Sequence, residues 1–334
     1  MGNCLKLLKE QPPSIALIIP PTSVEQEKEN LKVFSFAELK KATKKFKEYT
    51  AKINGYESAY IRTYKGYINE TTFSPSRAET GIAVSVMECV QYNSSQALQE
   101  WKEEVKSLGE ISHPNLLKLL GYCCEDNKSF LVFEYLQNES LDCHIFEKEE
   151  ALPWEIRVKI AIGAAQGFAF LHSVKTSALY RAFRMCDIML DEQYNAKLFY
   201  LGCNKLCLLE ESITTAFIGR TDYTPPEYVI SGHLGMKSDV YTFGVILLEL
   251  LTGLKASDGA KNKNKQSLIS TKPFLSDKDK IREIIDPRLG NDYPVNATTQ
   301  MGKLIKRCIK LDAKKRPLMQ QVLDGLNDIA MIKD

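Results

Sequence analysis

The sequence lacks several features that would assign it to a class directly. No apolar run approaches the roughly 18 residues needed to span a bilayer, and the stretch IALIIPP is short and ends in prolines. None of the four histidines lies in a C-x-x-C context with zinc-ligand spacing. A formal charge of +2 gives no support to nucleic-acid binding, which usually depends on a concentrated basic face. These absences argue against an integral membrane protein, a zinc protein and a nucleic-acid binder.

The nine cysteines do not suggest a disulfide framework. Their number is odd, they are scattered along the chain, and no signal peptide precedes them. We therefore expect free thiols in a reducing compartment.

What is present is a change of pattern along the chain. Residues 1–33 contain four prolines between positions 10 and 30 and no sustained periodicity, so we expect a tail. The segment FSFAELKKATKKF then predicts a helix, because Ser35 is a suitable N-cap and Glu38 completes a capping box. From about 50 to 135, short β-branched and aromatic segments predict strands around one amphipathic helix, ALQEWKEEVKSLGEI. The rest is mainly helical, which indicates an α+β fold with a small strand-rich lobe and a larger helical lobe.

Five stretches carry a family resemblance, and they occur in the family's order over about residues 34–328: FSFAELKKATKKF, EWKEEVKSLGEISHPNLLKLLGYC, LVFEYLQNESLDCHIF, YTPPEYVISGHLGMKSDVYTFGVILLELLTG and DAKKRP. They resemble the plant receptor-like cytoplasmic kinases of the Pelle-related superfamily, especially the subfamily VII-like members with an acylated N-terminus. The resemblance implies a bilobal protein-kinase-like fold. It divides the chain into a tail (1–33), an N-lobe with its leading helix (34–135), a C-lobe (136–330) and a short end (331–334).

The expected nucleotide-binding residues are largely replaced. Where the family has a glycine-rich loop, this sequence keeps Gly55 but has Tyr56, Ser58 and Ala59, whose Cβ atoms obstruct a close approach of phosphates to the backbone. Met87 stands where the family has its strand lysine, and a thioether neither neutralises nor donates to a phosphate. The presumed helix partner of that lysine, Glu104, remains.

The expected catalytic residues are replaced as well. In the stretch YRAFRMCD, Ala182 takes the place of the general base, Arg184 that of the usual lysine, and Asp187 that of the asparagine. Tyr200 stands in the position of the metal-binding aspartate, 18 residues after Ala182 as the family pattern requires. A neutral phenol is a poor ligand for a hard cation. We therefore predict an inactive serine/threonine kinase (a pseudokinase) that has no metal site and for which Mg·ATP is not an expected cofactor.

The positions that support the kinase scaffold are retained. The resemblance implies an ion pair between Glu227 and Arg316, and a role for Asp239 in holding the backbone of the catalytic loop. Hydrophobic contacts that align the two lobes are assigned to Leu108, Tyr180 and Leu201.

Two regions are candidates for covalent modification. Thr214 and Thr215 align with the activation-loop phosphosite of active relatives, and Arg181 is a candidate partner for a phosphate there. MGNC at the start offers Gly2 for myristoylation and Cys4 for palmitoylation, although Lys6 stands where serine or threonine is usual. Two acyl chains, helped by Lys6 and Lys9, would hold the chain at the cytoplasmic face of the plasma membrane.

The function expected from these features is that of a membrane-tethered adaptor, regulator or decoy in plant receptor or immune signalling. Its expected partners are active receptor-like or cytoplasmic kinases, an immune receptor and the membrane surface, and no nucleic acid. Two alternatives remain open from the sequence: an atypical serine/threonine kinase with displaced catalytic groups, and a sensor that binds ATP without hydrolysing it.

Overall fold

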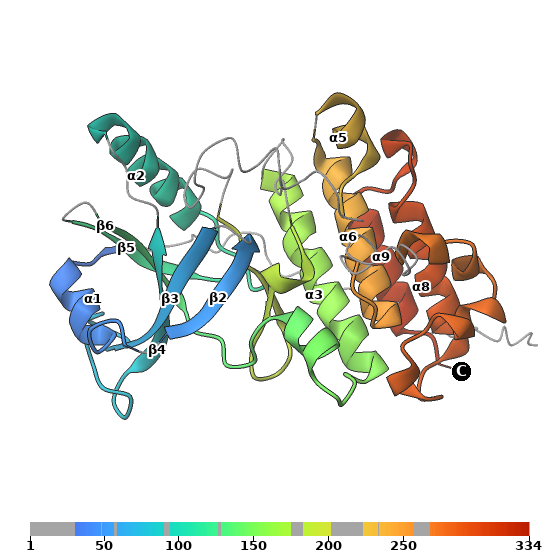
Figure 1. Cartoon of the computed structure of the whole chain (residues 1–334), viewed down its shortest axis with the longest axis horizontal. Helices are drawn as coiled ribbons and strands as arrows, with labels where there is room; N and C mark the ends of the chain where they lie inside the picture. Colours follow the sequence, from blue (N-terminus) through green and yellow to red (C-terminus); the bar gives the residue numbers. More distant parts are fainter. Residues whose placement is uncertain are drawn as a thin grey trace, which may run out of the picture.

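In the computed structural model, the chain folds into two lobes (Figure 1). The structure describes residues 31–47, 49–56, 59–89, 94–125, 128–174, 183–201, 223–232, 234–256 and 268–333, with only the backbone described for 49–56 and 59–61. None of the helices in these ranges is both long and apolar enough to cross a bilayer.

The N-lobe is built on a six-stranded sheet in the order β1-β5-β6-β4-β3-β2. β1 runs parallel to β5, and the other neighbouring strands are antiparallel. The strands are β1 (Lys32–Val33), β2 (Tyr49–Tyr56), β3 (Ala59–Ile68), β4 (Ile82–Cys89), β5 (Leu119–Glu125) and β6 (Lys128–Glu134). The expected tail boundary at residue 33 is therefore corrected, because Lys32 and Val33 already pair with Gly121 and Tyr122.

Helix α1 (Phe36–Ala42) starts as its sequence predicts. The Ser35 hydroxyl accepts a hydrogen bond from the Glu38 N–H at 3.2 Å, and the Glu38 carboxylate accepts one from the Ser35 N–H at 2.7 Å, which confirms the capping box. The expected helix continued to Phe46, and this was wrong. The helix stops at Thr43, and Lys44, Lys45 and Phe46 follow at positive φ.

Helix α2 (Ser95–Gly109) packs against the sheet through an amphipathic face. Trp101, Val105 and Leu108 are buried on it, in agreement with the predicted 3.6-residue spacing.

The C-lobe consists mainly of helices packed around α6 (Figure 1). Its longer helices and the small hairpin next to the N-lobe are α3 (Trp154–Val174), α5 (Pro226–Ser231), α6 (Met236–Thr252), α8 (Val295–Cys308), α9 (Met319–Ala330), β7 (Ile188–Leu190) and β8 (Ala196–Leu198). Short 3₁₀ turns occupy Met185–Asp187, Leu268–Thr271, Phe274–Ser276, Lys280–Glu283, Pro287–Leu289 and Ala313–Lys315, and one π turn spans Cys143–Glu147.

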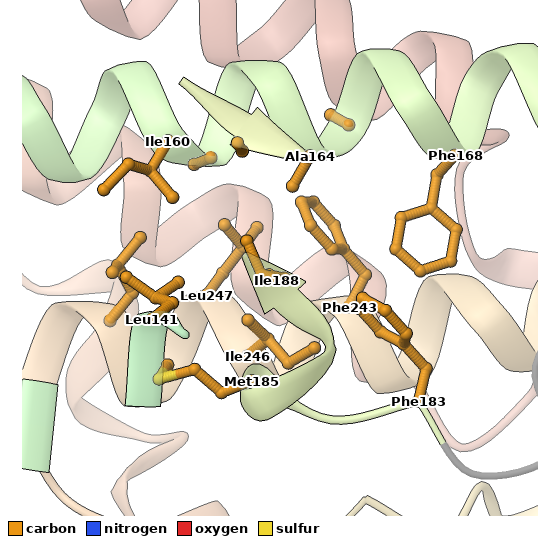
Figure 2. Packing of buried hydrophobic residues seen from close by; sticks show 14 of the residues in the cluster. Leu141, Ile160, Ala164, Phe168, Phe183, Met185, Ile188, Phe243, Ile246 and Leu247 are labelled. Atoms are coloured by element: carbon orange, nitrogen blue, oxygen red, sulfur yellow. The ribbon is translucent and has the colours of Figure 1, made fainter. Parts of the chain in front are cut away.

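The centre of the C-lobe is aromatic and aliphatic (Figure 2). Phe168 of α3 meets the edge of Phe183 at 4.7 Å between ring centroids and lies 5.5 Å from Phe243 of α6. All three side chains are at most 1% exposed. Phe183 belongs to the catalytic-loop stretch YRAFRMCD, so this packing attaches the described part of that stretch to α3 and α6.

A buried ion-pair network ties α3 to the end of α6. Arg157 donates to Asp286 at 2.6 Å and to the Leu250 carbonyl at 2.7 Å, and Arg288 donates to the same carboxylate at 2.7 Å. Burial alone would raise the pKa of Asp286, but the hydrogen bonds from Arg288 and Arg157 lower it below its ordinary value. Gly253 ends α6 at φ 67°, and a Cβ there would lie 2.6 Å from the Asp286 carboxylate. The network therefore needs this glycine.

We predict that Asp286→Asn lowers the free energy of unfolding by about 3–5 kcal/mol, because it leaves a buried guanidinium without its counter-charge. Because the folded-state pKa is lowered, the stabilisation is complete above the unfolded pKa of about 3.9 and is lost as the pH falls below it. Urea unfolding at neutral and acidic pH measures both effects. Asp292→Asn, at an exposed carboxylate, is the matched control, and an equal loss in both variants would contradict the assignment.

Candidate functional site

Met87 lies where a kinase would present its phosphate-binding lysine. It is on β4, between Thr63 of β3 and Leu131 of β6, and its side chain is 1% exposed. Val84 and Val86 face the small core under α1, whereas Met87 and Cys89 belong to the large hydrophobic cluster that also contains Trp101. The position is therefore filled by a buried apolar side chain.

Tyr200 lies where a metal-binding aspartate would be, and it is also buried, with 4% of its surface exposed. The preceding residue, Phe199, packs edge-on against Phe133 of β6 at 5.6 Å. Leu201 is partly buried against the same cluster, and Leu108 of α2 is a buried member of it on the N-lobe side. Aromatic packing thus takes the place of a hard anionic ligand.

Polar contacts fasten this part of the C-lobe to the N-lobe. The Asn115 side chain donates to the Ala196 carbonyl at 2.8 Å, the Leu117 N–H donates to the Leu198 carbonyl at 3.0 Å, and Lys197 pairs with Glu134 at 2.8 Å. The lobes therefore meet through direct protein contacts along β8.

Asp187, in the position of the family's asparagine, closes a tight turn. Its carboxylate accepts a hydrogen bond from the Arg184 N–H at 2.8 Å, and its carbonyl accepts one from the Phe199 N–H at 2.8 Å. Burial raises the pKa of the Asp187 carboxyl to about 6, against the lowering effect of Arg184. The Asp187 carboxyl therefore supports the backbone of the turn. Among the described residues, no three His, Cys, Asp or Glu side chains form a group able to hold a metal ion.

For some of the other predicted site residues the structure describes only the backbone or the burial, and the rest lie outside the described residues. Gly55 and Tyr56 are at the end of β2 and Ala59 is at the start of β3, while Glu104 is a half-buried residue of α2. The remaining positions lie outside the described residues: Gly2, Cys4, Lys6, Lys9, Ser58, Tyr180, Arg181, Ala182, Thr214 and Thr215.

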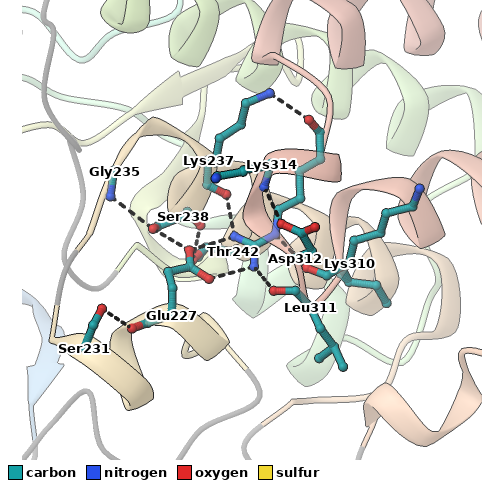
Figure 3. Close-up of polar contacts among 12 residues, drawn as sticks. Glu227, Ser231, Gly235, Lys237, Ser238, Thr242, Lys310, Leu311, Asp312 and Lys314 are labelled. Atoms are coloured by element: carbon teal, nitrogen blue, oxygen red, sulfur yellow. Dashed lines mark hydrogen bonds and ion pairs between the residues drawn. The ribbon is translucent and has the colours of Figure 1, made fainter.

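The predicted scaffold ion pair is present (Figure 3). Arg316 donates to both oxygens of Glu227 at 2.7 Å, and Ser238 donates to the same carboxylate at 2.7 Å. Burial alone would raise the pKa of Glu227, but the hydrogen bonds from Arg316 and Ser238 lower it. The pair is bidentate, with the Arg316 side chain fully buried, and it joins α5 to the segment before α9.

Asp239 has a partner that the sequence analysis missed. Its carboxylate lies 2.9 Å from Nε2 of His172, near the end of α3. The expected contact with the catalytic-loop backbone involves residues outside the described ranges and stays a prediction. His172 closes the C-terminal turn of a predicted helix, and nothing in the sequence marked it as a partner.

Glu249 is a second group that the sequence analysis missed. It is fully buried in α6, where it accepts hydrogen bonds from the Tyr223 hydroxyl and, at 2.8 Å, from the Ala256 N–H. Burial raises the pKa of the Glu249 carboxyl to about 8, although both hydrogen bonds favour the ionised form. The available signal was a lone acidic residue in the apolar stretch VILLELLTG. Through Tyr223, this carboxyl anchors the start of the segment that leads into α5.

Comparisons with known proteins agree with this geometry. A model of the protein tyrosine and serine/threonine kinase family matches residues 57–326. The chain is 76% identical to the inactive serine/threonine-protein kinase BKN2 of Arabidopsis thaliana and 60% identical to BKN1, also named inactive, with 100% of both chains covered in each case. The solved structure of an apo pseudokinase shares the fold, with a TM-score of 0.66 at 23% identity over 91% of this chain and 98% of that one.

The chain therefore belongs to the protein kinase family, as an inactive member of the receptor-like cytoplasmic kinase type. The α+β bilobal fold expected from the sequence is confirmed.

We predict that Met87→Lys lowers the free energy of unfolding by at least about 3 kcal/mol, because it places an ammonium group in a sealed apolar position. Met87→Leu is the control and should cost less than about 1.5 kcal/mol. Urea unfolding followed by tryptophan fluorescence compares the two. Equal stability of the two variants would contradict the prediction. It would mean that water reaches the position or that the new lysine forms an ion pair with Glu104.

The raised pKa of Glu249 predicts that the stability of the chain depends on pH. Because the folded-state pKa of Glu249 is raised, its contribution to stability is complete below the unfolded pKa of about 4.3 and declines as the pH rises towards 8. Glu249→Gln mimics the neutral acid, so its stability relative to the natural chain should grow by up to about 1.4 kcal/mol per pH unit between pH 5.5 and 7.5. Denaturation at several pH values measures this difference. Glu192→Gln, at an exposed carboxylate, should show no such trend, and the same trend in both variants would refute the assignment.

Proposed function

We propose that this pseudokinase works as a binding module: a membrane-tethered adaptor, regulator or decoy in plant receptor or immune signalling. The observation that carries the proposal is the contrast between two parts of one fold. The positions that would bind and transfer phosphate hold Met87 and Tyr200, both buried, whereas the ion pair of Glu227 and Arg316 under α5 is complete. The fold around α5 is kept although the groups for phosphoryl transfer are replaced, and such a surface is suited to binding another protein.

Mg·ATP does not fit the site. The three charged groups that a kinase uses for phosphoryl transfer are all replaced, by the sulfur of Met87, the methyl group of Ala182 and the phenol of Tyr200. The carboxylates that remain nearby, Glu104 and Asp187, would repel phosphates, and Asp187 is already bonded to the Arg184 N–H. We therefore propose that the chain acts without nucleotide.

The proposed partner is an active receptor-like or cytoplasmic kinase, alone or together with an immune receptor. Support comes from α5, where Val229 and Ile230 are 71% and 85% exposed on a helix fixed underneath by Glu227. Two adjacent exposed aliphatic side chains on a rigid element are suited to a protein contact. In this proposal, the partner phosphorylates Thr214 or Thr215. Arg181 then forms an ion pair with the phosphothreonine.

The proposed location is the cytoplasmic face of the plasma membrane, through acylation of Gly2 and Cys4. One myristoyl chain gives only marginal binding, and palmitoylation of Cys4 supplies a second anchor.

The test is affinity purification of the tagged full chain from solubilised plant membranes, with co-purifying kinases identified by mass spectrometry. An active kinase of the receptor-like or cytoplasmic type should accompany the natural chain and be lost, by at least tenfold, in the double variant Val229→Asp, Ile230→Asp. The double variant Leu254→Asp, Met331→Asp changes two other exposed apolar side chains and should retain the partner.

Gly2→Ala, in the same experiment, should move the chain from the membrane fraction to the soluble fraction. Equal recovery of the kinase with both double variants would refute the α5 contact. Unchanged membrane recovery of Gly2→Ala would refute the acyl anchor.

A further inference from the structure

A dense group of lysines follows the last turn of α1. Lys40, Lys41, Lys44, Lys45 and Lys47, here called the α1 lysine cluster, occupy five of eight successive positions in a chain whose net charge is only +2. All five side chains are exposed. Positive charge is therefore locally dense in this segment.

The backbone under the cluster is held in an unusual conformation. Lys44, Lys45 and Phe46 have φ values of 50°, 67° and 57°, a left-handed run that costs roughly 1–2 kcal/mol per L-residue. Thr43 closes the turn, because its hydroxyl donates to the Leu39 carbonyl at 2.7 Å and accepts from the Phe46 N–H at 3.1 Å. Such strain persists only where the surroundings enforce it.

The enforcing contact is the ring of Phe46. It stacks on Phe36 at 5.6 Å and on Phe130 at 5.3 Å, and it meets the edge of Tyr64 at 5.0 Å. Exposed lysines precede and follow this anchored ring in the chain, so the turn keeps them close to one another. The last carbonyls of α1 add negative partial charge beneath them, which helps to keep the lysines together.

Two neighbouring carboxylates lie at the start of α1, and a third, that of Glu88, accepts a hydrogen bond at 3.3 Å from the hydroxyl of Tyr64, whose ring contacts Phe46. Glu38 is bonded to the Ser35 N–H and hydroxyl, and Glu125 accepts from the Phe36 N–H at 2.7 Å. Glu38 and Glu125 are therefore engaged at the helix start, and the five lysines outnumber Glu88 on the side of the helix end.

The cluster lies at the outer end of the strand-rich lobe. Figure 1 shows α1 at the N-lobe end of the molecule, with α5 and α6 in the other lobe. The chain before β1 has 31 residues, which reach at most about 100 Å when extended, so an anchor at Gly2 permits this end of the lobe to touch a bilayer.

We propose that the α1 lysine cluster binds the anionic phospholipid surface of the cytoplasmic leaflet. The chemistry recognised is the negative headgroup charge of lipids such as phosphatidylserine. The proposal rests on the membrane tether of the proposed function and adds an orientation to it: the N-lobe end faces the bilayer and α5 points towards the cytosol. Each lysine near such a surface contributes about a fivefold gain in binding, so the cluster acts as the second signal beside an acyl chain.

The test uses the full chain produced in bacteria without acyl groups, so that only the protein surface is measured. Co-sedimentation compares vesicles of phosphatidylcholine alone with vesicles that also contain phosphatidylserine. Binding should need phosphatidylserine and should weaken as salt is raised. The triple variant Lys41→Gln, Lys45→Gln, Lys47→Gln should bind on the order of 100-fold more weakly, from about fivefold per lysine.

Two further variants make the result specific. Lys303→Gln, Lys314→Gln, Lys315→Gln removes three exposed lysines from the C-lobe and should leave binding unchanged. Lys41→Arg, Lys45→Arg, Lys47→Arg keeps the charge and should bind like the natural chain, which separates loss of charge from loss of the strained turn.

Three results would overturn the proposal: no binding of the natural chain to phosphatidylserine vesicles, equal binding to phosphatidylcholine alone, or equal losses in the N-lobe and C-lobe glutamine variants. Binding of RNA with the same lysine dependence, but not of vesicles, would also overturn it. None of these outcomes affects the acyl anchor or the α5 contact, because the bacterial protein lacks the first and the assay does not use the second.

Discussion

The arrangement of the two lobes depends on the apolar contact between them. In an active kinase this junction holds charges that would repel or lose hydration if no nucleotide and metal balanced them. Here Met87, Phe199 and Tyr200 join the N-lobe sheet to the C-lobe within one hydrophobic cluster. No ligand is needed to compensate a charge at these three positions, so the lobes can remain together through protein contacts alone.

The C-lobe has its own electrostatic supports, and they are independent of the junction. Arg157 with Asp286 joins α3 to the end of α6, Arg316 with Glu227 holds α5, and Glu249 fixes Tyr223. Each is a buried or half-buried polar group whose partners are all protein atoms. Loss of the catalytic groups therefore leaves the helical base and its α5 surface intact, and this division makes a binding function physically reasonable.

Much of this was predictable from the sequence, where the signal is local or follows the family pattern. The Ser35–Glu38 capping box, the buried face of α2 and the replacements at Met87 and Tyr200 were read from spacing and alignment. The early end of α1 was not, because it goes with the stacking of Phe46 on Phe130, a residue distant in the sequence. Three further features were not predicted, because each depends on residues distant in the sequence. They are strand β1, the pair of His172 with Asp239, and the raised pKa of Glu249.

The central claim, that the fold persists without phosphotransfer chemistry, is tested most directly by a radiolabelled-phosphate assay. The purified full chain is incubated with γ-labelled ATP, with Mg²⁺ or Mn²⁺ and with a general acceptor protein, beside an active relative prepared in the same way. The account predicts incorporation at background level under every condition. Incorporation that follows the chain through purification, and that is lost when Asp187 is replaced by alanine in a folded variant, would contradict it.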